Sequence, residues 1–413
     1  MEKQSFFGID IGEKYSIISF YEQDMKEPES IATVAGSENF QVPTFIAKRK
    51  NLGQWFYGEE AKNQVAQGNA TGVDHLYERA LAGEEILIEG EVYGAADLLL
   101  LFLRKLIHLP EKHYEVGELV AAAVSVAKVD EKVLRLFAPF GRLLNISREH
   151  FFVVEHRESF YYYALNGESS LFMNDVALFD YQNNRLTSLI LRRDRSTSPQ
   201  IISFDEIHAE PFLDNKDREF SKFAGEVLEG RKVSSAYLIG DGFDGDWMKD
   251  SLPVICHNRR VFLGKNLYSK GAAYIAAQKA LDLKWPYIYM GDHELKVNTL
   301  LKVYTDNKME FFTLLSAGVS WYDCKGECEV ILDGTPEVEL WILHPQSRKP
   351  EVLKLMLPDL PERPPKATRL RITATATADT KIHVVIKDLG FGEIYKSSGQ
   401  HWEYDLELES REQ

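Results

Sequence analysis

The sequence predicts an α/β domain over residues 1–284, followed by an all-β domain over residues 293–413. Strand-like and helical runs alternate up to about residue 285, and beyond it strand-like runs follow one another between polar turns. The length of 413 residues agrees with two domains, because it exceeds the size of one ordinary hydrophobic core. Residues 285–292 are the expected linker, with Tyr287–Met290 as its apolar part.

The first domain contains alternating strand-like and helical segments. In the helical segment Val92–His108, leucines and Phe102 fall on neighbouring turns, and Arg104 and Lys105 lie near its end, where positive charge suits the helix dipole. We therefore expect this helix to pack in the core. The other segments are a helix over Lys265–Leu281 and strand-like runs over Phe6–Phe20, Leu119–Val126, Val176–Leu191 and Ala236–Ile239.

The second domain is predicted to consist of strands. Val338–Leu343, Arg369–Thr377 and Lys381–Lys387 are its clearest strand-like runs. The proline-rich segment Asp359–Pro365 separates them and predicts a surface connection, because proline fixes its own torsion and lacks a ladder donor. Only a short acidic tail follows Trp402–Leu408, so no helical segment is expected there.

Charge and composition restrict the classes of partner and compartment. The chain has 48 basic and 63 acidic residues, and its net charge of -15 disfavours nucleic acid and anionic membranes as partners. No apolar signal core follows the first five residues, and the longest apolar run is Leu98–Leu103. The three cysteines form no cluster with histidine, which disfavours a zinc site and suits a reducing compartment. We therefore predict a cytoplasmic protein.

One motif near the amino terminus carries the strongest functional signal. Residues 7–16 indicate a strand, a tight turn and a second strand, with Asp10 just before the turn and Gly12 in it. This segment resembles the first phosphate loop of the actin-like ATPases, and most closely that of the seventy-kilodalton heat-shock chaperones, Gly-Ile-Asp-x-Gly-Thr-Thr-x-Ser. The resemblance implies that Asp10, Gly12, Lys14 and Tyr15 contact a nucleotide.

Further segments resemble the same chaperones in the same order along the chain. The resemblance implies an actin-like nucleotide-binding fold with duplicated ribonuclease H-like subdomains, then a β-sandwich similar to the peptide-binding domain, without the helical lid. It also implies ATP or ADP with magnesium as ligand, and Asp180, Gly240, Asp241 and Gly242 as further binding residues. The segments are the helix in Tyr57–Ala66, the strand and glycine turn in Ser234–Phe243, the alanine-rich helix in Leu267–Ala277, and the proline-rich loop with two strands in Pro361–Lys387.

The catalytic set of that family is not retained. Glu13 and Lys14 replace the two threonines of the first loop, and Asn183-Asn184 follows Asp180 where the family has glycines, so an ordinary hairpin turn is the competing interpretation. Where the family carries a phosphate-contacting lysine, only Arg79 has the right charge.

Two other differences concern the metal position and the adenine. Glu155 or Glu158 lies where the family positions metal and water, although a carboxylate at a helix start is the alternative role for either. Only 60 residues separate Asp180 from Gly240, which implies a reduced subdomain over the adenine.

Other chemistries have weaker support. The sequence contains no P-loop, zincin helix or hydrolase elbow. The acidic loop Gly240–Asp246 suits a hard cation, but acidic turn residues before a helix are also common caps. The aromatic run Phe160–Tyr163 suits base stacking or core packing, and the acidic composition favours core packing.

We therefore expect a binding or scaffolding protein with a degenerate ATPase domain and little or no ATP hydrolysis, whose partner is an extended polypeptide or another protein. The rival hypothesis is an active ATP-dependent chaperone in which Asp10, Lys14, Asp180 and one of Glu155 or Glu158 form an unusual Mg·ATP site. A third is a polymer-forming actin relative, which the appended β-domain disfavours.

Overall fold

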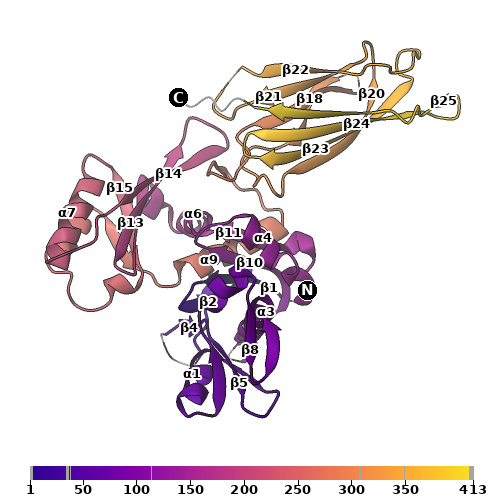
Figure 1. The fold of residues 1–413 in the computed structure, drawn as a ribbon. Coiled ribbons are helices and arrows are strands. Elements are labelled where there is room, and N and C mark those ends of the chain that lie inside the picture. The colour runs from indigo at the N-terminus through magenta and orange to yellow at the C-terminus, as the bar shows by residue number, and fades with distance from the viewer. Residues whose placement is uncertain are drawn as a thin grey trace. The chain divides into compact units, whose positions relative to one another are not determined.

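Figure 1 shows the computed structural model, which describes residues 3–33, 37, 39–112, 114–306, 308–347 and 349–408. The chain forms two compact units. The first comprises Met1–Leu191 and Asp205–Lys284, and the second comprises Arg192–Phe204 and Trp285–Gln413. Among the described residues, none of the helices has the length and apolar character needed to cross a lipid bilayer.

Two six-stranded sheets share the same plan of strands. In the first, β1 lies between β10, which is parallel to it, and β2, which is antiparallel, and β11 extends the parallel side. In the second, β12 lies between parallel β15 and antiparallel β13, and β16 extends the parallel side. The first sheet contains β1 (Gln4–Ile11), β2 (Tyr15–Tyr21), β3 (Glu29–Ser30), β4 (Val42–Pro43), β10 (Glu118–Val126) and β11 (Phe151–Glu155). The second contains β12 (Asp175–Gln182), β13 (Arg185–Asp194), β14 (Gln200–His208), β15 (Val233–Ile239), β16 (Arg260–Leu263) and β17 (Tyr287–Tyr289).

Smaller sheets and helices complete the first unit. One small sheet contains β5 (Ile46–Arg49), β6 (Trp55–Tyr57) and β7 (Ala70–Val73), and a hairpin contains β8 (Glu85–Ile88) and β9 (Glu91–Gly94). The helices are α1 (Gly58–Ala66), α2 (Leu76–Ala82), α3 (Ala95–Ile107), α4 (Glu131–Phe137), α5 (Phe140–Leu143), α6 (His156–Asn166), α7 (Lys216–Leu228), α8 (Ser251–Ile255) and α9 (Leu267–Ala280).

Helix α9 packs directly on strand β1, and Gly8 makes this close contact sterically allowed. A Cβ atom at Gly8 would lie 2.0 Å from the carbonyl oxygen of Ser269 on α9. A larger residue would therefore push the helix away from the strand that carries Asp10. The glycine of the amino-terminal motif thus has a packing role that is independent of any ligand.

Two predicted segments differ from the structure. Helix α3 begins at Ala95, because residues 91–94 form β9 and pair with β8, whereas the prediction began at Val92. Its apolar face is buried as predicted. The expected linker contains a strand, β17, which pairs in parallel with β14.

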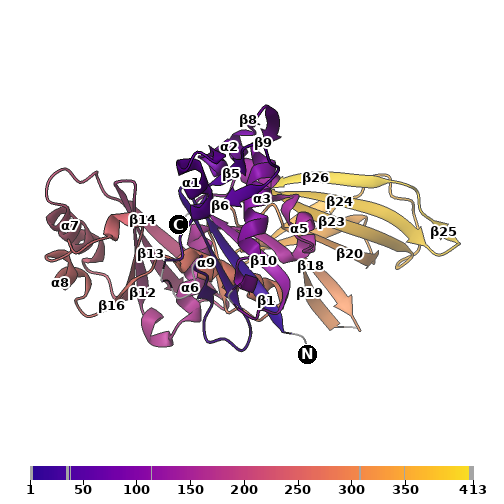
Figure 2. The same ribbon diagram turned by 90° about the horizontal axis from the view of Figure 1, so that it is seen from below.

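The second unit contains two antiparallel sheets that share one hydrophobic core, in addition to residues 192–204 and β17. Leu301 and Leu340 contribute to the core from one sheet, and Ile372 and Val384 contribute from the other. Figure 2 shows β23, β24 and β26 side by side. The first sheet has the order β19-β18-β21-β22, with β18 (Asn298–Thr305), β19 (Lys308–Leu315), β21 (Glu337–Leu343) and β22 (Glu351–Met356). The other contains β20 (Lys325–Leu332), β23 (Thr368–Ala378), β24 (Lys381–Phe391), β25 (Tyr395–Lys396) and β26 (His401–Glu407).

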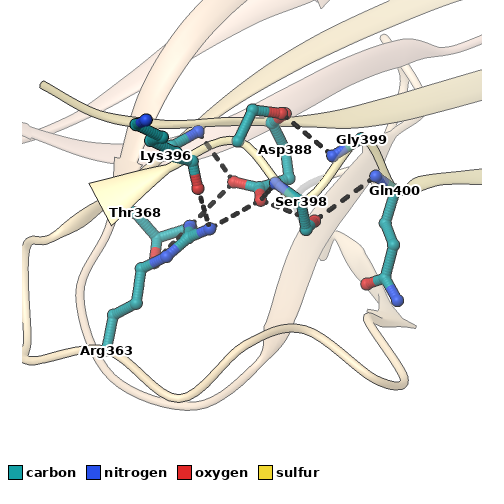
Figure 3. A network of polar contacts seen from close by, with 9 residues as sticks. Arg363, Thr368, Asp388, Lys396, Ser398, Gly399 and Gln400 are labelled. Atoms are coloured by element: carbon teal, nitrogen blue, oxygen red, sulfur yellow. Dashed lines mark hydrogen bonds and ion pairs between the residues drawn. The ribbon is translucent and has the colours of Figure 1, made fainter. Parts of the chain in front are cut away.

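A buried ion pair ties the proline-rich connection to β24. The side chains of Arg363 and Asp388 are 5% and 0% exposed, and two guanidinium nitrogens donate to the two carboxylate oxygens at 2.8 and 2.7 Å (Figure 3). Burial alone would raise the pKa of Asp388, but Arg363 and donors from Ser398 and Gly390 hold it well below its usual range. The predicted surface connection therefore has a buried anchor, which its composition does not indicate.

The substitution Asp388→Asn should strongly destabilise the second unit, because it leaves the Arg363 charge buried without its partner. We expect a loss of about 3 to 5 kcal/mol in the free energy of unfolding, measured by denaturant titration. The control is Asp405→Asn, since Asp405 is 90% exposed and pairs with His383 at 2.8 Å. The control should cost less than about 1 kcal/mol. Equal losses in the two variants would contradict the buried anchor.

Candidate functional site

The two strand-turn-strand segments at the centre of the two large sheets lie against each other. Each central strand carries an aspartate near its end, Asp10 on β1 and Asp180 on β12. The turn after β1 contacts the turn after β12, because Lys14 Nζ donates to Asn183 Oδ1 at 2.8 Å. Asn183 and Asn184 both have positive φ angles, of 50° and 58°, so the predicted tight hairpin is confirmed.

A chain of polar side chains links the two aspartates. His156, the first residue of α6, places Nε2 2.9 Å from Asp10 Oδ1. Its ring stacks on Tyr268 of α9, with centroids 3.9 Å apart and an interplanar angle of 9°. The Tyr268 hydroxyl donates to Asp180 Oδ2 at 3.2 Å. The carboxylates of the two sheets are therefore connected through groups of the protein itself.

Burial shifts the pKa values of two groups in this chain, Asp180 and Tyr268. Burial raises the pKa of Asp180 to about 6, and nearby Asp10 adds to the shift. The charge of His156 and hydrogen bonds from Gln182 and Tyr268 oppose it. Burial also raises the pKa of Tyr268 well above its usual value, so its hydroxyl keeps its proton and acts as a donor.

The first turn is closed by its own backbone and by one neighbouring threonine. The Gly12 amide donates to the Tyr15 carbonyl at 3.0 Å, and Thr44 Oγ1 donates to the Gly12 carbonyl at 2.8 Å. Tyr15 begins β2 and is 40% exposed, and Lys62 Nζ lies 5.3 Å from the centre of its ring. Tyr15 therefore contacts α1 rather than the linked aspartates.

The other charged residues expected near the site have structural partners. Glu13 Oε1 lies 2.8 Å from His75 Nδ1, and Arg79 Nε donates to Glu84 at 2.8 Å. The Glu155 carboxylate accepts from the Val129 amide at 2.9 Å. These contacts direct each charge to a neighbouring segment of the fold.

Two further predictions concern the first turns of α6. Glu158 lies in the first turn of α6, as expected for a carboxylate at a helix start. Its Oε1 accepts a hydrogen bond from Lys279 Nζ at 3.1 Å. The aromatic run that follows is largely buried in α6, which confirms core packing for Phe160, Tyr161 and Tyr162.

The glycine turn after β15 packs against the residue that follows Asp180. A Cβ atom at Gly240 would lie 2.3 Å from the Tyr181 carbonyl, and one at Gly242 would lie 2.4 Å from the Tyr181 ring. Lys216 Nζ donates to the Gly242 carbonyl and lies 4.2 Å from the centre of the Trp247 ring. Burial lowers the pKa of Lys216, and the carboxylates of Asp241 and Asp244 oppose this shift.

Sequence reasoning missed the two residues that link the aspartates. His156 directly follows β11 and lies beside Glu155, one of the two glutamates expected near the metal position. Its place at the end of a parallel strand is the feature of the sequence that could have identified it. Tyr268 belongs to the alanine-rich helix α9. A large aromatic side chain among small residues is the feature of the sequence that could have identified it.

Two family models match the chain. The one described as "Family of unknown function (DUF5716) C-terminal" covers residues 27–292, more than half of the 413 residues. The chain belongs to the DUF5716 family. A domain of unknown function, DUF8552, matches residues 294–408. Comparison with curated proteins gives no match.

Substituting Gly240 by alanine should destabilise the first unit more than the same change at Gly245. Both glycines have positive φ angles, of 98° and 89°, but the new Cβ at Gly240 would meet the Tyr181 carbonyl, whereas none of the described residues lies within 4 Å of a Cβ at Gly245. We expect a loss of about 1 kcal/mol for Gly245→Ala and more than about 2 kcal/mol for Gly240→Ala, measured by denaturant titration. Similar losses would show that the turn does not pack on Tyr181.

Asp180→Asn should remove a specific pH dependence of stability. Because the pKa of folded Asp180 is about 6 and that of the unfolded residue about 3.8, the folded state retains a proton that the unfolded chain loses. Stability from this group is present below pH 4 and is lost as pH rises to about 6. The variant should therefore gain stability relative to the unmodified protein by on the order of 2 kcal/mol between pH 4 and pH 7. Urea titrations across this range test this, and a constant difference would contradict it.

Proposed function

We propose that this protein is a binding or scaffolding protein of the cytoplasm, built on a degenerate actin-like ATPase domain that resembles that of the seventy-kilodalton heat-shock chaperones. It performs little or no ATP hydrolysis and engages an extended polypeptide through its second unit. The observation that carries the proposal is the chain from Asp10 through His156 and Tyr268 to Asp180.

The repeated sheet plan supports the ancestry in this proposal. In both large sheets, a central strand has a parallel neighbour on one side and an antiparallel neighbour on the other. The two central hairpins meet at Lys14 and Asn183. This repeated arrangement is what duplication of a ribonuclease H-like subdomain would produce.

The side chains at the two hairpins fit Mg·ATP poorly. Asp10 and Asp180, which the rival hypothesis places in the Mg·ATP site, are hydrogen-bonded to His156 and to Tyr268, respectively. Lys14, the cation expected to face the phosphates, donates to Asn183. A nucleotide would have to break these contacts before gaining its own, and that cost lowers its affinity.

The hairpin turns also lack the features that stabilise phosphate. Glycine-rich turns let backbone amides approach an anion, whereas Asn183 and Asn184 close an ordinary two-residue turn here. Glu13 adds a negative charge to the other turn. Two like unit charges about 4 Å apart repel by roughly 4 kcal/mol at an effective dielectric constant of about 20.

An edge strand of the second unit supports the polypeptide partner. Strand β19 ends its sheet, so in the part of the chain that the structure describes its outer edge has no paired strand. Residues 308–313 of this strand are exposed and include Met309, Phe311 and Phe312. A strand edge offers unpaired backbone amides and carbonyls to an added strand. Apolar side chains beside that edge increase the affinity of the protein for the added polypeptide.

Binding of a labelled, permanently unfolded polypeptide, followed by fluorescence anisotropy, tests the proposal. We expect saturable binding with the same Kd in the presence and absence of Mg·ATP. Phe311→Lys should weaken binding, because it places a charge beside the edge of β19. Ile331→Lys is the matched control, since Ile331 on β20 is also exposed, and it should bind normally.

Two results of this experiment would contradict different parts of the proposal, polypeptide capture at β19 and the absence of a role for ATP. Absence of binding, or equal weakening by both substitutions, would contradict polypeptide capture at β19. A Kd that changes severalfold with Mg·ATP would favour the rival, an active ATP-dependent chaperone that uses Asp10, Lys14, Asp180 and Glu155 or Glu158.

A further inference from the structure

We infer that Glu13, His75 and Glu78 form a binding site for a divalent transition metal, best suited to Zn²⁺. One ligand atom of each residue lies within 4.8 Å of the others. The site is separate from the Asp10–His156 contact and does not depend on the proposed function.

Two segments far apart in the sequence supply the ligands. Glu13 lies in the turn between β1 and β2, whereas His75 and Glu78 lie at the start and in the first turn of α2. Nδ1 of His75 lies 2.8 Å from Glu13 Oε1 and 3.4 Å from Glu78 Oε2. Two carboxylates thus approach the same ring nitrogen from different elements.

Two of the three ligand separations are close to the tetrahedral value, and the third, between Glu13 and Glu78, is at most 4.8 Å. Bonds of about 2.0 to 2.2 Å to nitrogen and oxygen place two tetrahedral ligands roughly 3.3 Å apart. The pair formed by His75 and Glu78 already has this separation, at 3.4 Å. The pair formed by His75 and Glu13, at 2.8 Å, must open by about half an ångström, which the partly exposed side chain of Glu13 allows.

The chemistry of the donors selects the class of metal. An imidazole nitrogen and two carboxylates supply nitrogen and oxygen ligands for a divalent ion. Ca²⁺ and Mg²⁺ prefer oxygen ligands alone, whereas Zn²⁺ readily accepts imidazole. Three protein ligands leave a fourth position for water.

Neighbouring cations have other partners. Arg79 donates to Glu84 at 2.8 Å and lies 3.8 Å from Asp74, and Lys14 donates to Asn183. Neither positive charge is therefore committed to Glu13 or Glu78 by a contact in the described structure. A metal ion would supply the charge that these two carboxylates share.

Calorimetric titration of the full chain with Zn²⁺ alone tests the inference. We expect one site, weakened by roughly tenfold or more in each of Glu13→Gln, Glu78→Gln and His75→Asn. Asparagine is chosen because His75 has a φ angle of 50°, a left-handed conformation that asparagine tolerates. The matched control is His108→Asn, since His108 and Glu111 form a similar exposed pair to which the described residues add no third ligand.

The result distinguishes this site from adventitious binding. The control should bind Zn²⁺ as tightly as the unmodified protein, and Mg²⁺ should bind far more weakly than Zn²⁺. Affinity should also fall at acid pH, because a proton competes with the metal for the imidazole nitrogen. A Kd weaker than about 100 μM, or undiminished binding in the three site variants, would overturn the inference.

Discussion

The contact between His156 and Asp10 is the interaction on which the candidate site depends. It connects the first residue of α6 to the central strand of the first sheet, and the stack of His156 on Tyr268 extends the connection to Asp180 in the second sheet. Asp10, His156, Tyr268 and one oxygen of Asp180 have contacts within the protein, so a ligand that binds these atoms must compete with contacts that already exist. Under the proposed function, this geometry is how the framework of a nucleotide-binding fold would be retained while its ligand-binding groups serve the structure.

Local patterns in the sequence were sufficient for the secondary structure around the site. Strand-like apolar runs located β1, β10 and β12, and the Asn183-Asn184 pair predicted its hairpin because asparagine tolerates positive φ angles. The exception at the start of α3 has a local cause as well. Residues 91–94 pair with β8, and helical periodicity alone does not report a strand partner.

Contacts between distant residues were beyond the same reasoning. The pairing of His156 with Asp10 spans 146 positions, and that of Lys14 with Asn183 spans 169. Periodicity identifies which face of an element is buried, but it does not identify the side chain that a polar group will meet there. The same reason applies to Arg363, whose burial against Asp388 depends on the packing of the whole second unit.

The central claim is that groups of the protein have taken over the positions that would hold Mg·ATP. Calorimetric titration of the purified full chain with ATP and with ADP, each with and without magnesium, tests it most directly. The account predicts no saturable heat at millimolar nucleotide under any of the four conditions. Magnesium-dependent binding in the micromolar range, abolished by Asp10→Ala, would contradict it.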